Sequence, residues 1–467
     1  MRSFYDLRFL RHFHSSHHLP SDEVRNPAGS RPTLDVMLSP SCGLFSFVLH
    51  RRRQCLALAC ALFFLTCLFR YWTPYDPNDS VRRMQESPRI ALNLHEKGQF
   101  ANPFFLVDTG PSAHVAPVFP VFLALLINVF GEGAAGIYAI KVMAAVIVAI
   151  QVALFPVFSS RLGMGELNGF IGACVWIAAK PRLEFNWEAH YAALLVAVTC
   201  CIYRWYLDRG PRGAGWVAWL LGFFMGLLVL TLPTFALVVA AWVGWEIWRE
   251  KSAFITKFVL PMVLFPALII SPWLIRNHLV FHRLMIRDDF GLELSQSNND
   301  CAQFSNRKNL DSGCADKVHP NGSEKEARKV LEVGEAQYND LRLREALRWI
   351  PSHPFRFIRL TGMRFVAFWL PTENGTIHYA GSGRRLERVL IYLMTLLSMW
   401  GLLILYRRDI KSAAVCMSCL FFYPLVYYIV SFIDRYRYPI MWVTFLLGAL
   451  PITEYLRSRY RLPQMTA

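Results

Sequence analysis

Apolar runs of about 20 residues recur along this chain, and they limit its fold more than any other feature. About 20 apolar residues are enough for a helix to cross the hydrocarbon core of a bilayer. Of the 467 residues, 54% are hydrophobic and 18% are charged, whereas soluble domains carry about 25% charged residues. The runs therefore predict an all-α, multi-spanning membrane protein and exclude a disordered chain, a collagen, a disulfide-rich mini-protein and a single-pass anchor. They lie near 54–71, 117–131, 136–158, 164–180, 190–206, 214–230, 233–248, 254–274, 388–405, 412–431 and 438–455.

The basic residues predict how these runs are oriented. The net charge is +16, and clusters of Arg and Lys adjoin the apolar runs at 50–53, 208–212, 248–251, 406–411 and 457–461. Basic loops mark the cytoplasmic side of a membrane, so we interpret the charge as topology and expect no nucleic-acid partner. All clusters share one side only if the short run 117–131, which carries Pro117 and Pro120, does not cross. We therefore expect about ten spans, with both termini in the cytoplasm.

This topology divides the chain into four parts. We expect residues 1–53 to form a disordered cytoplasmic tail, and 54–274 to form a transmembrane module with a large first external loop at 72–135. Residues 275–387 form an external cap segment, and 388–467 hold the last three spans and a short basic tail. Within the cap, periodicity predicts one helix over 326–350 and a basic, aromatic amphipathic helix over 353–369. Cys301 and Cys314 share the polar part of the cap and would pair in an oxidising compartment.

Short motifs in the external regions resemble those of integral-membrane glycosyltransferases of the GT-C fold that use a polyprenyl-phosphate sugar. Within that group, the resemblance is to the bacterial type of the protein O-mannosyltransferase and aminoarabinose transferase family. Its members have an acidic residue, an RIA-type helix, a GxGF turn, a GPTA-like stretch and a PxYP helix ending in FG. The chain departs from the pattern with Gln99 in the turn, Ser112 for Thr, Phe119 for Tyr, and Glu188 for an Asp. The matching segments are Glu86, 89–91, 98–100, 110–113, 117–120, 130–131, 271–281, 287–298 and 434–440.

The resemblance implies a hexosyl- or pentosyltransferase of the cell envelope. The sugar would pass, with inversion, from polyprenyl phosphate to a hydroxyl or phosphate of a glycan, lipid or protein acceptor. The active site would lie on the periplasmic or extracellular side of the plasma membrane, in contact with membrane lipids. Such a site needs a carboxylate to accept the acceptor's proton, cations for the leaving phosphate and a groove for the lipid.

Three carboxylates are candidates for the catalytic role. Glu86 is the first choice, from the resemblance and from its place before the helix at 89–91; an acid at a helix N-terminus would also occur there for stability alone. Asp79 is a rival by position just after the first span, although Asp beside Pro77 is also typical of a turn. Glu188 would add a second acid from the second external loop, or would simply be a solvated neighbour of Trp187.

Arginines on the outer side are candidates for binding the phosphate. Arg435 and Arg437 begin the last span, and Arg276 follows the seventh. Basic residues on the outer side are exceptions to the tendency of Arg and Lys to mark the cytoplasmic side, and Arg can bind phosphate with two parallel hydrogen bonds. The alternative is that these side chains snorkel from a helix end toward the membrane surface. Tyr436, between the first two, joins the predicted substrate-binding set.

Arg89 and His114 complete that set. Arg89 shares a helix face with Glu86, where an ion pair is the simpler interpretation. His114 would be structural or would contact the acceptor.

Paired acids could hold Mg²⁺ or Mn²⁺, but the resemblance implies no metal, and we expect no cofactor. The alternative function is a transporter or lipid flippase, for which we would expect internal repeats and charged residues within the spans. The sequence shows no clear repeat, and its charged residues gather at the ends of the spans.

Overall fold

The structure is a computed structural model that describes residues 52–72, 81, 84–213, 215–249, 260–370 and 385–460. The chain separates into two compact units, 1–55 and 56–467, and the second contains nearly all described residues. That unit is helical, and its described extended pairs are two isolated bridges, Ala101 with Pro111 and Ser305 with Phe432. The all-α prediction is confirmed. Asp79 and the predicted tail, apart from its last two residues, lie outside the described residues.

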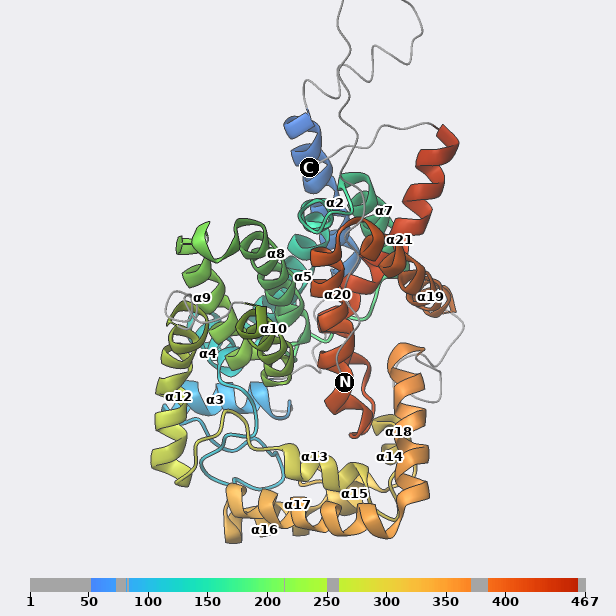
Figure 1. Cartoon of the computed structure of the whole chain (residues 1–467). Helices are drawn as coiled ribbons and strands as arrows, with labels where there is room; N and C mark the ends of the chain where they lie inside the picture. Colours follow the sequence, from blue (N-terminus) through green and yellow to red (C-terminus); the bar gives the residue numbers. More distant parts are fainter. Residues whose placement is uncertain are drawn as a thin grey trace, which may run out of the picture. The chain divides into compact units, whose positions relative to one another are not determined.

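Each predicted apolar run contains a helix (Figure 1). Six helical segments are long and apolar enough to cross a bilayer: 54–71, 134–153, 260–281, 385–408, 410–428 and 438–460. The full set of ten spans, and the placement of the 117–131 helix outside the hydrocarbon, stay predictions. The helices are α2 (Arg52–Tyr71), α4 (Val118–Phe130), α5 (Ala134–Ala153), α6 (Phe155–Arg161), α7 (Glu166–Ala179), α8 (Ala189–Gly213), α9 (Gly215–Thr231), α10 (Ala236–Arg249), α12 (Phe265–Phe281), α19 (Arg385–Arg408), α20 (Ile410–Phe422) and α21 (Tyr438–Tyr460).

The last helix, α21, is the core of the bundle. All of its residues from Tyr438 to Pro451 are buried, and it packs against α7, α8 and α19. Small residues allow this close packing, as they commonly do between membrane helices. A Cβ atom added at Gly401 of α19 would lie 1.8 Å from the carbonyl oxygen of Leu447. Glycine is therefore required where α19 meets α21.

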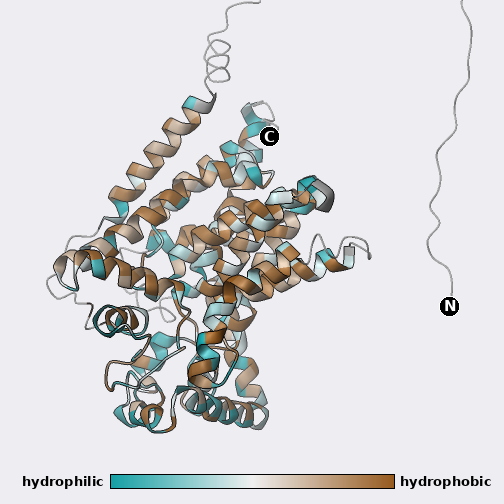
Figure 2. Cartoon of the chain, turned by 90° about the vertical axis from the view of Figure 1, so that its left-hand side faces the viewer, coloured by the Kyte–Doolittle hydropathy of each residue, from teal (hydrophilic) through white to brown (hydrophobic). Residues whose placement is uncertain are grey.

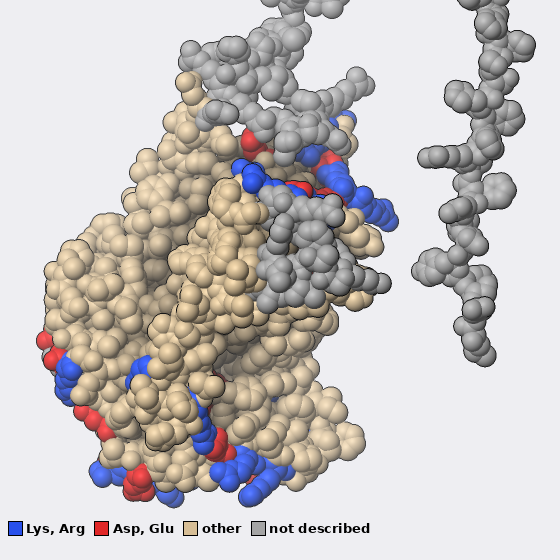
Figure 3. Space-filling model, turned by 60° about the vertical axis from the view of Figure 1, so that its left-hand side comes forward, with Lys and Arg blue, Asp and Glu red and all other residues tan. Residues whose placement is uncertain are grey.

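The predicted external segments gather at one end of this unit. In Figure 1, α13 (Phe290–Ser297), α16 (Glu324–Val333) and α17 (Glu335–Ser352) lie together at the bottom. Figure 2 shows that this end is mainly hydrophilic and the bundle above it mainly hydrophobic. On the face drawn in Figure 3, charged side chains gather toward the top and bottom and leave an uncharged band between them. This distribution fits a bilayer around the bundle.

The cap has the predicted helices. The expected helix over 326–350 appears as α16 and α17, separated at Gly334, where φ is 84°. The amphipathic helix appears as α18 (Pro354–Trp369). Cys301 and Cys314 form a disulfide. Within the cap, α13 lies against α17.

Candidate active site

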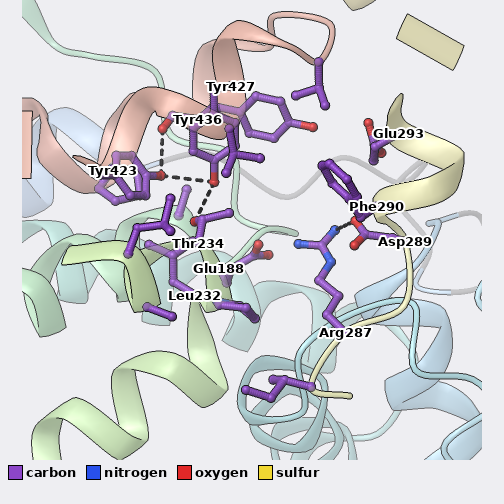
Figure 4. A pocket seen from close by; sticks show the side chains of 18 of the residues that line it. Glu188, Leu232, Thr234, Arg287, Asp289, Phe290, Glu293, Tyr423, Tyr427 and Tyr436 are labelled. Atoms are coloured by element: carbon purple, nitrogen blue, oxygen red, sulfur yellow. Dashed lines mark hydrogen bonds and ion pairs between the residues drawn. The ribbon is translucent and has the colours of Figure 1, made fainter. Parts of the chain in front are cut away.

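A cavity of about 620 Å³ lies where the bundle meets the external segments (Figure 4). One part of its wall is apolar and comes from the α9–α10 turn, α12 and the segment after α12. The other part carries the charged and phenolic side chains. The apolar part includes Leu232, Pro233, Leu237, Leu274, Leu284, Met285 and Ile286, and the polar part includes Glu188, Arg287, Asp289, Glu293, Arg435 and Tyr436. The cavity thus has one region suited to hydrocarbon and one suited to charged or hydroxylated groups.

Three sequence-predicted residues meet in this lining. Glu188 precedes α8, and its carbonyl oxygen accepts a hydrogen bond from the Ala192 N–H at 2.8 Å, which starts the helix. Arg435 lies in a short turn of 3₁₀ helix, η6 (Asp434–Tyr436), with its guanidinium 3.5 Å from the centre of the Trp187 ring. The ring of Tyr436 stacks on that of Tyr427 at 4.5 Å. Residues separated by more than 200 positions in the sequence therefore share one surface.

Sequence reasoning missed three other charged residues of the lining. Arg287 forms an ion pair with Asp289 at 2.6 Å, and its Nε donates to the carbonyl oxygen of His114 at 3.0 Å. Glu293 projects from the first turn of α13. The segment 287–298 matches the family motifs, but the sequence assigned it no role. The sequence feature that could have indicated a site here is a basic residue followed by two acids, directly before a short apolar helix.

Glu86 lies behind this lining, at the start of α3 (Ser87–Lys97). Its φ is 59° and its ψ is −111°, which is rare for a residue with a side chain, and its N–H donates to the Pro103 carbonyl at 2.8 Å. Strained backbone of this kind is often found at functional sites. Glu86 is only 9% exposed, and its Oε2 lies 3.8 Å from Nε2 of the buried His114. The two residues thus form a buried ion pair next to the cavity.

The ion pair determines the charge of both groups. Burial alone would raise the pKa of Glu86, but His114 and the positive charge of Arg435 lower it to about 2. Burial alone would lower the pKa of His114, but Glu86 raises it to about 9. Both groups are therefore charged at neutral pH. Glu86 in this state is a weak proton acceptor, because its conjugate acid is strong.

Glu293 has the opposite surroundings. Burial and the negative charges of Asp289 and Glu86 raise its pKa to about 7, against the opposing effects of Arg287 and His114. Its Oε2 accepts a hydrogen bond from Gln296 Nε2 at 2.6 Å. Ion pairs between described residues at this end of the cavity engage Asp289 and Glu86 but not Glu293. The site therefore holds carboxylates with very different affinities for a proton.

The other predicted substrate-binding residues lie outside the described lining. Arg276 falls within α12 and not after a span as expected, because the helix continues to Phe281. Its guanidinium donates to the carbonyl oxygens of Ser112 and Phe100 at 2.7 and 3.0 Å, and so holds the first loop.

Arg437 and Arg89 also have partners within the protein. Arg437 is 1% exposed and donates to the Trp369 carbonyl and the Thr395 hydroxyl, both at 2.6 Å. Arg89 forms its described ion pair with Asp108 at 3.0 Å, although the sequence suggested Glu86 as the partner. Neither guanidinium group belongs to the described lining of the cavity.

Metal binding would require several carboxylate or imidazole groups to converge. Carboxylate oxygens suit Mg²⁺ and Mn²⁺. Across the described ranges, no group of three or more His, Cys, Asp or Glu side chains is arranged to hold an ion. Among the described residues, the cations that line this cavity are the guanidinium groups of Arg287 and Arg435.

Comparison with known proteins gives a likeness of fold. No family model matches the chain, and no curated protein matches it. One similar solved structure is the archaeal oligosaccharyltransferase AglB from Archaeoglobus fulgidus, in complex with an inhibitory peptide and a dolichol-phosphate. The TM-score is 0.50 and the sequence identity 15%, over 88% of this chain and 52% of that one. The apo form of the oligosaccharyltransferase from the same organism gives a TM-score of 0.48 at 15% identity, over 87% and 51% of the two chains.

This likeness supports the fold that the motifs suggested. The chain has a GT-C-like helical fold. It spans about half the length of the oligosaccharyltransferases that it matches. At 15% identity the match concerns architecture alone. The finer family assignment stays a prediction.

Proposed function

We propose that this chain is a membrane glycosyltransferase that moves a sugar from a polyprenyl-phosphate donor to a hydroxyl or phosphate of an acceptor. The observation that carries the proposal is the cavity, which joins an apolar wall to two arginines and three carboxylates. A lipid-linked sugar needs these same elements: a surface for the chain, cations for the phosphate and a proton acceptor for the attacking group. The likeness to AglB, whose structure holds a dolichol-phosphate and an inhibitory peptide, adds support.

In this proposal, Arg287 and Arg435 bind the phosphate. The donor phosphate carries one negative charge, and the lipid phosphate that leaves carries up to two. Cations that are already in place stabilise this growing charge without reorganising. Arg287 is oriented by Asp289 and by the His114 carbonyl, and Arg435 by the Trp187 ring. Leu237 and Leu284, which are 40% and 74% exposed, offer the lipid an apolar surface at the edge of the cavity.

We assign the proton acceptor to Glu188. The sequence favoured Glu86, with Asp79 and Glu188 behind it, but Glu86 is tied to His114 and is a weak base. Glu188 lines the cavity directly, and none of the ion pairs between described residues at this end of the cavity engages it. A single displacement at the anomeric carbon would invert its configuration. Glu86 then serves to keep His114 charged and the first loop in place.

The compartment follows from the topology. The cavity lies at the end of the bundle that carries the cap, and the basic clusters predict that this end faces away from the cytoplasm. We therefore place the reaction on the periplasmic or extracellular side of the plasma membrane. Membrane lipids surround the bundle, and the acceptor is a glycan, a lipid or a protein.

The test is transfer by the purified full chain in lipid nanodiscs. Polyprenyl phosphates labelled in mannose or in aminoarabinose serve as donors, with extracted envelope material as the acceptor, and released lipid phosphate is measured. We expect transfer by the wild type, and a loss of about 10²-fold or more in Glu188→Gln. Glu332→Gln, on the exposed face of α16, is the matched control and retains the activity.

Two results would contradict the proposal. Full activity in Glu188→Gln would remove this residue from the reaction. Movement of intact donor across proteoliposomes, with no sugar transferred to any fraction, would favour the lipid flippase alternative.

A further inference from the structure

We propose that Glu293 is a general acid that protonates the leaving lipid phosphate, and so works with Glu188 as an acid–base pair. This inference rests on the proposed function and adds a catalytic residue to it. The starting point is the position of the two carboxylates. Both line the cavity, Glu188 from the segment before α8 and Glu293 from α13, and Figure 4 shows them on different sides of it.

The reaction requires charge to be balanced inside the cavity. The lining carries the three carboxylates of Glu188, Asp289 and Glu293 against the two guanidinium groups of Arg287 and Arg435. A donor phosphate adds one negative charge, and cleavage adds a second. In a half-buried cavity, accumulated negative charge is unfavourable. One protonated carboxylate removes this conflict when the donor binds, and its proton can then neutralise the leaving group.

The surroundings of Glu293 select it for this role. On its own side of the site, Asp289 precedes it and Arg287 is already paired with Asp289. Glu86 and His114 face it from the first loop, Tyr436 faces it from η6, and Gln296 hydrogen-bonds to it from the next turn of α13. These neighbours, together with burial, raise its pKa to about 7.

The helix that packs behind α13 fixes its direction. Asn339 Oδ1 of α17 accepts the Leu292 N–H at 3.1 Å. A Cβ added at Gly291 would lie 2.0 Å from the Asn339 carbonyl oxygen, so the two helices are in close contact there. Glu335 of α17 accepts the Ala113 N–H at 2.6 Å. Glu293 therefore keeps its place facing the cavity.

The proposed step balances in atoms and charge. An acceptor hydroxyl attacks the anomeric carbon and loses its proton to Glu188, whereas an acceptor phosphate attacks as the anion and has no proton to lose. The bond between that carbon and the phosphate oxygen breaks, and its electron pair stays on the oxygen. That oxygen takes the proton from Glu293, so the lipid phosphate leaves as a monoanion. The second pKa of a phosphate monoester is about 6, which is close enough to accept this proton. Exchange with water then returns both carboxylates to their starting states.

The test is the pH dependence of kcat for wild type, Glu293→Gln and Glu293→Asp in nanodiscs. A general acid predicts a wild-type kcat that falls as pH rises through about 7 or above, since the donor phosphate raises the pKa further. We expect Glu293→Gln to lose about 10²-fold or more of kcat and to lack this alkaline limb. Glu293→Asp retains the limb at a lower rate, and Glu332→Gln matches the wild type.

The outcomes separate the two proposals. A wild type that transfers no sugar from any donor overturns the proposed function, and this inference with it. A wild type that transfers sugar, with Glu293→Gln matching its rate and pH profile, overturns the inference alone. A slow Glu293→Gln variant that still shows the alkaline limb also overturns it, because the residue would then have only a structural role. Thermal unfolding of each variant establishes that it is folded.

Discussion

Replacing Glu86 by Gln should leave His114 buried beside a neutral amide. In the wild type, the fall in the pKa of Glu86 from its ordinary 4.5 to about 2 corresponds to at most about 3 kcal/mol of stabilisation. Removal of one partner of a buried ion pair costs a similar amount, roughly 3–5 kcal/mol. The raised pKa of His114 reports the same interaction from the other side, so the two contributions are not added. We expect Glu86→Gln to lower the free energy of unfolding by up to about 3 kcal/mol.

The sign of the pH dependence follows from the same pair. His114 has a folded-state pKa raised to about 9, so its contribution is complete below about pH 6.5 and is lost as pH rises through 9. Glu86 has a depressed pKa, so its contribution is complete above about pH 4.5 and is lost as pH falls toward 2. The stability difference between wild type and Glu86→Gln should therefore be largest near pH 5–6 and should shrink by pH 9.5.

Thermal unfolding in detergent, followed by tryptophan fluorescence from pH 5.5 to 9.5, measures this difference. Glu332→Gln, an exposed carboxylate on α16, is the control and should follow the wild type throughout. A difference between wild type and Glu86→Gln that stays constant across this range would refute the ion-pair reasoning. The loss of stability would then have a cause other than the charges of Glu86 and His114, since the backbone conformation at position 86 is the same in both proteins.

Three further changes test the packing of the bundle and cap. Gly401→Ala places a methyl group against the Leu447 carbonyl and should cost about 1–3 kcal/mol, seen as a lower unfolding temperature. Arg364→Met leaves buried main-chain carbonyls of two segments without their donor and should cost about 3 kcal/mol, checked in the same way. Cys301→Ser combined with Cys314→Ser opens a loop with a sequence separation of 13 and should cost about 3 kcal/mol, seen as faster limited proteolysis of the cap.

Helix positions could be predicted because their signals are local. Runs of apolar residues and the 3.6-residue period in the cap depend on nearby residues alone, and all of these stretches contain helix, although the one over 326–350 is divided into α16 and α17. Side-chain direction could not be predicted in the same way. Arg435 and Arg437 are two residues apart, yet the first lines the cavity and the second is buried against Trp369 and Thr395. The difference depends on how η6 packs against the rest of the bundle.

Glu293 was missed for a related reason. Its helix is eight residues long, and nothing in its own sequence determines which face meets the cavity. The contact of Gly291 with Asn339 makes that choice, through residues almost 50 positions apart. Long-range packing of this kind has no signature in a single sequence. The acids that the resemblance suggested could be named, while the acid selected by tertiary contacts could not.

The cap is expected to be necessary for catalysis even though α16 and α17 supply none of the residues that line the cavity in the described part of the chain. Residues 113–114 of the first loop connect the two regions. Glu335 of α17 accepts the Ala113 N–H, and the Ala113 and His114 carbonyls accept bonds from the Asp288 N–H and from Arg287 at 2.8 and 3.0 Å. His114 in turn holds Glu86 in its charged form. Glu335→Gln should therefore disturb Arg287 and the stabilisation of the leaving phosphate while leaving Glu188 untouched, which a fall in kcat and kcat/KM relative to wild type and Glu332→Gln would show.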